Sequence, residues 1–239
     1  MSPYRKPPIT EAIIELRTAD PVPDKLVDKA AAAIKKRYAR AEYLHEFTVK
    51  IGATTNDAPV RVGHKLSSER GDYIAQPRRR GLALSSLAPY PGWTNFTVEF
   101  EEIWGRWKKA VGPRRLDRVG VRFINRIDVP WVEGQRLDSD DYLRVGIKLP
   151  ESSGNFSNAW QVATVSPVKE TPFNVTIRAG TTDPALFGYA SFVLDLDLHC
   201  EVDVPQSDAD IFALLGKAKL AKNQVFEECI TDHTRALLA

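Results

Sequence analysis

The ten-residue run RVGVRFINRI at 118–127 is the most informative stretch for chemistry, because it carries an arginine at every fourth position. Side chains alternate between the two faces of a β-strand. An extended run would therefore place Arg118, Arg122 and Arg126 on one face, and Asn125 among apolar residues on the other. A strand rises roughly 3.3 Å per residue, so neighbouring arginines would stand about 13 Å apart. They could follow an extended anion, or each could pair with a different carboxylate.

A second run, FVLDLDLHCEVD at 192–203, could supply those carboxylates. The same alternation would place the leucines on one face and an acidic ladder on the other. The ladder comprises Asp195, Asp197, His199 and Glu201. Carboxylates two residues apart lie about 7 Å from each other, so they converge on one metal ion only if the strand twists or bulges. We therefore predict cross-strand ion pairs, each contributing up to about 1 kcal/mol, and no metal site.

A third candidate is the basic cluster of Arg78, Arg79 and Arg80. Together with the arginines of 118–127 it could bind an anionic ligand, although such a cluster is also typical of a solvated hairpin turn. No sequence motif of an RRM, KH, zinc-finger or helix-turn-helix domain accompanies it. The sequence also lacks a glycine-rich phosphate loop and a GxSxG nucleophile elbow. These absences favour a protein that is not an enzyme without deciding the question, and we expect no cofactor.

Length and composition are those of an ordinary globular protein, with 239 residues, 43% hydrophobic and 27% charged. The longest apolar runs fall far short of the roughly 20 residues that span a bilayer. The first residues carry no secretory signal, and two cysteines are too few for a disulfide framework. We therefore expect a cytoplasmic protein that makes no membrane contact.

Charge is distributed unevenly along the chain. The segment 61–126 carries 14 Lys/Arg against 6 Asp/Glu, whereas 127–239 carries 9 against 17. This asymmetry indicates either a basic face that is available to an anionic partner, or two parts that neutralise each other inside one fold.

Hydrophobic periodicity predicts an α+β protein with a mainly antiparallel sheet, two or three packed helices and a long C-terminal helix. The predicted strands are 9–17, 47–51, 60–66, 73–76, 82–84, 118–129, 159–165, 173–178 and 192–204. The predicted helices are 24–40, 94–109 with an aromatic core stripe, 138–145, and 207–237 with Ser207 as its cap and a bend near Gly216. We expect one compact domain over 1–239. The order strand, helix, strands, helix occurs twice, so duplicated halves at 1–112 and 113–239 are the alternative.

Three segments together resemble the "sporadically distributed" family of uncharacterised bacterial and archaeal proteins. These are YRKPPITEA at 4–12, the arginine run at 118–127 and FEECITD at 226–232. The blocks are ordered and span nearly the whole chain, although Phe123 stands where the family usually has tyrosine. The resemblance implies a prokaryotic cytoplasmic protein with no established activity. Its patchy occurrence would fit mobile or defence-related genes, including toxin–antitoxin-like systems.

Two functional hypotheses follow. The first is a protein-binding module, antitoxin-like or defence-associated, that offers strand edges or the C-terminal helix to a partner or to its own copy. The alternative is a protein that binds or processes nucleotides or nucleic acid through the arginines of 118–127 and 78–80.

Overall fold

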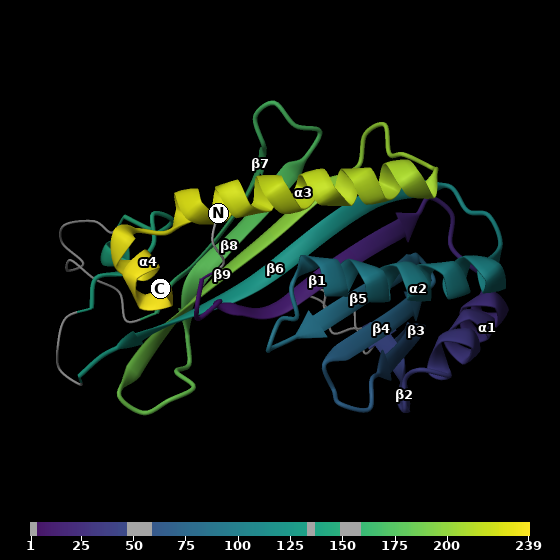
Figure 1. Cartoon of the computed structure of the whole chain (residues 1–239), viewed down its shortest axis with the longest axis horizontal. Coiled ribbons are helices and arrows are strands. Elements are labelled where there is room, and N and C mark those ends of the chain that lie inside the picture. Colours follow the sequence, from purple (N-terminus) through teal and green to yellow (C-terminus); the bar gives the residue numbers. More distant parts are fainter. Residues whose placement is uncertain (1–3, 47–58, 133–136, 149–158) are drawn as a thin grey trace, which may run out of the picture. The chain divides into compact units, whose positions relative to one another are not determined.

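A computed structural model of the protein describes residues 4–46, 59–132, 137–148 and 159–239 (Figure 1). Within these ranges the fold is α+β, with nine strands and four α-helices. The strands form an antiparallel sheet and hydrogen-bond in the order β2-β3-β4-β5-β1-β6-β9-β8-β7. The predicted fold class is thus confirmed.

The chain divides into two compact units. Unit 1 comprises Met1–Ala12 and Gly120–Ala239, and unit 2 comprises Ile13–Val119. Two long strands, β1 (Ile9–Thr18) and β6 (Leu116–Pro130), each contribute residues to both units. The first residues of the chain therefore belong with its C-terminal half.

Unit 2 is a strand meander with two helices. Its elements are α1 (Asp24–Lys35), β2 (Arg40–Glu46), β3 (Val60–Ser67), β4 (Tyr73–Arg78), β5 (Gly81–Leu87) and α2 (Trp93–Val111). The predicted aromatic stripe of α2 is buried, and Trp104 stacks on Trp107 with ring centroids 5.0 Å apart. Aromatic side chains bury large apolar areas, so this stripe supplies much of the core of the unit.

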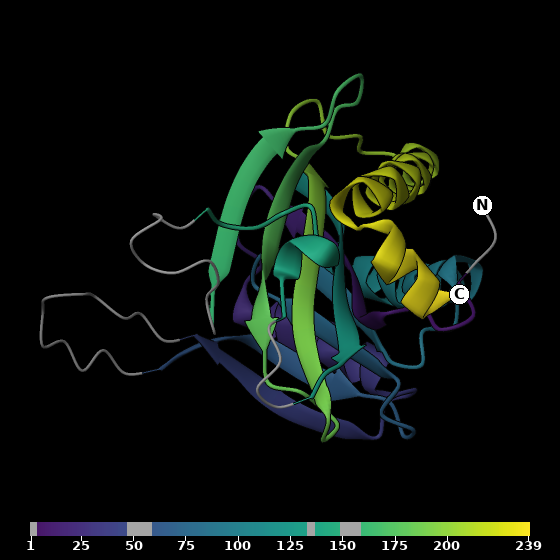
Figure 2. The same cartoon turned by 90° about the vertical axis from the view of Figure 1, so that its left-hand side faces the viewer.

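Unit 1 contains the remaining strands and the C-terminal helices. Its elements after β6 are the 3₁₀ turn Ser139–Asp141, β7 (Gln161–Pro167), β8 (Asn174–Thr182), β9 (Tyr189–Cys200), α3 (Asp208–Cys229) and α4 (Asp232–Leu238). Helix α3 lies along one face of the strands of this unit (Figure 2). Ser207 caps α3 as predicted, since its hydroxyl accepts a hydrogen bond from the Asp210 amide.

Some predicted boundaries are wrong. The C-terminal helix is interrupted at Ile230, not near Gly216, because Ile230 has an extended backbone and bridges to Leu143. Helix α1 ends at Lys35, and the next strand, β2, was not predicted because its sequence RAEYLHE has no clean apolar alternation. The predicted strand at 47–51 lies outside the described residues.

All three blocks of the family resemblance contribute residues to unit 1. The Tyr4 hydroxyl donates a hydrogen bond of 2.8 Å to Glu227, and the Tyr4 ring packs edge-on against Phe226. The backbone amide of Arg126 donates to the carbonyl of Pro8. Burial, together with the Glu227 carboxylate, raises the pKa of Tyr4 to about 12. The N-terminal segment is therefore fastened to both β6 and α3.

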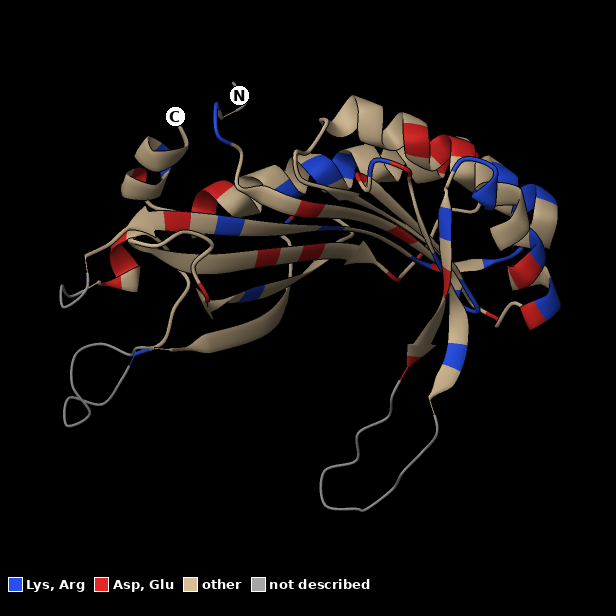
Figure 3. Ribbon diagram, turned by 90° about the horizontal axis from the view of Figure 1, so that it is seen from below, with Lys and Arg blue, Asp and Glu red and all other residues tan. Residues whose placement is uncertain are grey.

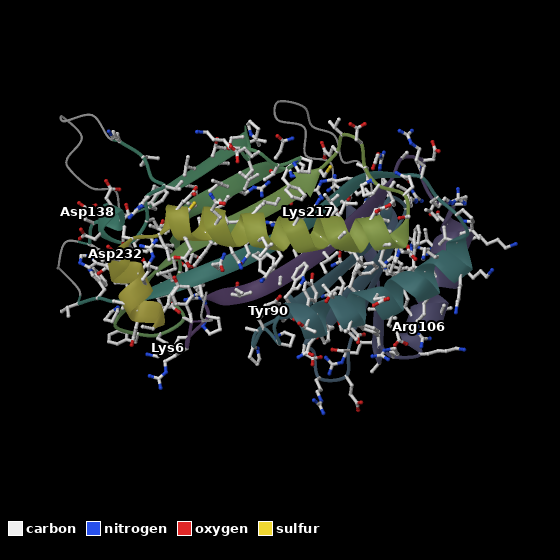
Figure 4. All side chains as sticks on the ribbon, turned by 45° about the horizontal axis from the view of Figure 1, so that its top comes forward. Lys6, Tyr90, Arg106, Asp138, Lys217 and Asp232 are labelled. Carbon is white, nitrogen blue, oxygen red and sulfur yellow. The ribbon has the colours of Figure 1, made fainter. Side chains whose placement is uncertain are left out.

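Lys222 is a charged residue on the buried face of α3. Its side chain is 6% exposed, and its ammonium lies 4.1 Å from the centroid of the Phe123 ring. Burial lowers the pKa of Lys222 to about 8, since desolvation disfavours the charged form. Lys217, on the same helix, is exposed (Figure 4).

We expect Lys222→Met to raise the free energy of unfolding at pH 7 by up to about 3 kcal/mol. At this pH the folded chain holds a buried charge, which methionine removes while it keeps the apolar stem. The gain should shrink between pH 8 and 10.5, where folded Lys222 is neutral but unfolded lysine still binds a proton. Urea unfolding across this pH range measures the change in the free energy of unfolding, with Lys217→Met as the control. A loss of stability at pH 7, or an equal effect of Lys217→Met, would contradict this assignment.

Candidate functional site

Three neighbouring strands of unit 1 are joined by a carboxylate that lies between two arginine side chains. Arg122 of β6 donates two hydrogen bonds to Asp195 of β9, from Nε to Oδ1 at 2.8 Å and from Nη2 to Oδ2 at 2.6 Å. Arg178 of β8 lies directly opposite Asp195 and approaches Oδ2 to 3.4 Å. The Asp195 side chain is 6% exposed, whereas those of Arg122 and Arg178 are 38% and 47% exposed. The arginines thus cover the carboxylate from solvent.

This geometry determines what Arg122 can do chemically. A guanidinium that binds a carboxylate through two parallel hydrogen bonds has used the fork with which it would bind a phosphate. The hydrogen bonds to Asp195 raise the pKa of Arg122, so its guanidinium stays charged. The main role of Arg122 is therefore structural, since it joins β6 to β9.

Arg126 makes a different set of contacts, at the end of β6 near the β8–β9 hairpin. Its Nε donates to Asp128 at 2.8 Å, and its Nη2 donates to the carbonyl of Asp183 at 3.0 Å and to the Ser191 hydroxyl at 3.1 Å. Ser191 in turn donates to Asp128. The Arg126 side chain thus connects β6, β9 and the first residue of the hairpin loop.

The loop that Arg126 holds is the hairpin connection 183–188 (Figure 1). Its far end is also fixed, because the carbonyl of Gly188 accepts a hydrogen bond from the Trp131 amide at 2.9 Å. Gly188 has a φ of 79°, which favours glycine. Between these anchors Leu186 is 58% exposed and Phe187 is fully exposed. We call these two residues the apolar tip.

Arg118 belongs to unit 2 and is buried. It pairs with Glu15, which Arg78 also approaches at 3.7 Å. Burial lowers the pKa of Arg78 below its ordinary value. The structure therefore brings two of the predicted basic residues together around one carboxylate.

The other two residues of the triple arginine also have acidic partners within unit 2. Arg79 binds Asp24 through two hydrogen bonds of 2.6 and 2.7 Å. The Nη2 atom of Arg80 lies 3.2 Å from the Oδ2 atom of Asp117. Figure 3 marks the Lys and Arg positions in blue and the Asp and Glu positions in red on the ribbon.

The predicted acidic ladder is shorter than expected. Asp195, Asp197 and His199 lie in β9, but this strand ends at Cys200, so Glu201 is outside it. The chain turns away here because Asp203 adopts a φ of 52° and Pro205 follows. His199 is 9% exposed, and its Nδ1 lies 4.0 Å from Asp197. In the part of the chain that is described, no three His, Cys, Asp or Glu side chains are grouped to hold a metal ion.

Asn125 lies on the core face of β6, as the alternation predicts. It is 2% exposed, and its amide donates to the carbonyl of Leu194 at 2.9 Å and to that of Phe123 at 3.2 Å. A buried amide with two partners is a structural tie, because leaving it unpaired would cost free energy. No ligand role is needed to explain it.

Sequence reasoning did not identify the apolar tip. Leu186 and Phe187 lie in the segment DPALFGY, where proline and glycine indicate a turn. Two large apolar residues inside a turn are the signal that could have found them, since turns are usually polar. Periodicity gives no such signal, because the loop has none.

No helix in the described ranges is long and apolar enough to cross a membrane. A scan against models of protein families and a search of the curated proteins each find no match for this chain.

We expect Asp195→Asn to lower the free energy of unfolding by about 2 kcal/mol, a value already reduced for the partial exposure of both arginines. The amide cannot accept both charged hydrogen bonds from Arg122, and Arg178 loses its partner. Chemical denaturation measures the effect. Asp232→Asn is the matched control, because Asp232 is 92% exposed and pairs with Arg235 only on the surface of α4. Equal losses in the two variants would show that Asp195 is not a structural tie.

Proposed function

We propose that this chain is a prokaryotic protein-binding module that holds its partner through the apolar tip, Leu186 and Phe187. The observation that carries the proposal is a fully exposed phenylalanine on a loop whose two ends are fixed. The antitoxin-like or defence-associated role rests on the family resemblance alone.

An exposed apolar side chain on an ordered support is suited to protein recognition. Burying a leucine or phenylalanine side chain contributes about 2 kcal/mol. A loop that is already ordered loses less conformational entropy on binding, so more of this energy appears as affinity. Aromatic anchors that fill a pocket on the partner commonly dominate an interface.

The charges around the tip indicate the chemistry of the partner. Asp183 is exposed beside the tip, and Asp128 is partly exposed near its base. Unit 1 as a whole carries 13 Lys/Arg against 18 Asp/Glu. An anionic lipid surface would repel such a face. We infer a protein with an apolar pocket and a basic rim.

The C-terminal helix α3 is a poorer docking surface than the sequence analysis expected. The apolar face of α3 is buried within unit 1, including Ile211, Leu215 and Ala218. A partner could not reach that face without unfolding the unit. The loop is therefore a better candidate for docking than the helix.

The alternative of nucleotide or nucleic-acid binding has weaker support. It needs guanidinium groups that are free to meet phosphates. Arg79, Arg118 and Arg122 each bind a carboxylate instead.

To test the proposal, the full chain is used to capture partners from an extract of its host, and the captured protein is then purified for titration. We expect Phe187→Ala to weaken the measured Kd about 30-fold, as a loss of about 2 kcal/mol implies. Val202→Ala is the control, because Val202 is 71% exposed on the same unit but lies outside the loop. A Kd that Phe187→Ala leaves unchanged would overturn the proposal.

Arg126 should act as a positioning residue for the tip. We expect Arg126→Gln to weaken binding of the same partner about tenfold, because the loop loses its tie to Asp183 and must be ordered on binding. Arg178→Gln removes another arginine of unit 1 and should leave the Kd unchanged. Circular dichroism checks that both variants are folded. Equal weakening by the two variants would indicate a general charge effect and not positioning of the loop.

A further inference from the structure

The two end strands of the sheet, β2 and β7, differ in how their free edges are protected from pairing with another chain. Strand β2 carries Arg40, Glu42 and Glu46, and its register with β3 is broken between Leu44 and His45. Charges and bulges of this kind keep an edge from pairing with another chain. Strand β7 (QVATVSP, 161–167) has no charged residue, and its pairing with β8 is continuous.

The outer edge of β7 has no strand beside it in the described part of the chain (Figure 2). Most of its side chains are exposed, and Val165 is 65% exposed. Its valines and threonine favour extended structure. The edge is therefore accessible and suited to strand addition.

The backbone register shows which groups face outward. The amide of Thr181 donates to the carbonyl of Trp160, and the amide of Val168 donates to the carbonyl of Phe173. In an antiparallel pair, alternate residues bond to the neighbouring strand. The even-numbered residues of β7 thus bond to β8, and Gln161, Ala163 and Val165 direct their N–H and C=O groups outward. Pro167 lacks an N–H.

We propose that β7 pairs antiparallel with β7 of a second copy of this chain, with Ala163 at the two-fold axis. In this register Ala163 bonds to its own copy, and Gln161 of each strand bonds to Val165 of the other. All outward N–H groups of the strand are then satisfied. A register centred on Thr164 would instead place Gln161 opposite Pro167, which cannot donate.

The side chains suit a second copy. Antiparallel self-pairing places identical residues at equal distances from the axis, so any charged strand risks like charges near each other. Strand β7 has none. Val162 of one strand would lie opposite Thr164 of the other, which is a favourable β-branched pair. This surface is separate from the apolar tip, so the proposal does not depend on the proposed function.

Sedimentation of the full chain tests the assembly. We expect a species of twice the 26.7 kDa chain mass that dissociates on dilution. Ala163→Lys should abolish it, because two lysines would meet at the axis. Tyr43→Lys, which adds the same charge at a 60% exposed position on the other end strand, should retain it. A wild-type monomer at every concentration, or a dimer that survives Ala163→Lys, would overturn the proposal.

Disulfide trapping tests the register. Directly opposed, hydrogen-bonded residues have Cα atoms about 5.5 Å apart, within the range that a disulfide spans. We expect Ala163→Cys to form a covalent dimer on oxidation. Val165→Cys should not, because it lies opposite Gln161 and about 13 Å along the strand from its own copy. Native Cys200 and Cys229 are buried and serve as the background. Trapping through Val165→Cys, or none through Ala163→Cys, would contradict the pairing.

Discussion

The pairing of arginines with carboxylates across neighbouring strands is the interaction on which the account of this protein depends. Asp195 is almost fully buried, and a buried carboxylate is costly unless it is paired and hydrogen-bonded. Arg122 and Arg178 meet that requirement from the two strands beside it. Arg118 of β6 likewise pairs with Glu15 of β1, whose side chain is 17% exposed. The arginines of the basic run 118–127 therefore hold β6 to neighbouring parts of the fold.

Among the described residues, one large aromatic side chain, that of Phe187, is fully exposed. The Arg126 network orders the base of the β8–β9 loop, and Phe187 at its tip contributes nothing to the core. A phenylalanine exposed on an ordered loop adds nothing to stability, and this supports the proposed binding role. The uncharged edge of β7 is a second such feature, since natural edge strands usually carry protective charges.

The sequence predicts those parts of the fold that depend on local periodicity. Strands β6 and β9 follow from the alternation at 118–127 and 192–203, and the buried stripe of α2 follows from its helical spacing. The pairing of Arg122 with Asp195 could be suggested but not assigned, because it depends on which strands are neighbours. Strand β2 was missed because most of its side chains are exposed, which removes the alternation. The burial of Lys222 was not predicted, because it depends on the packing of its ammonium group over the Phe123 ring of another element.

The claim that the arginines are structural is tested most directly by titrating the full chain with a labelled single-stranded oligonucleotide at low salt. We expect no saturable, salt-dependent binding, because carboxylates already occupy the guanidinium groups. Binding that weakens steeply with salt and is lost in Arg122→Gln would contradict the account, and would show that an anion displaces Asp195 from its partner.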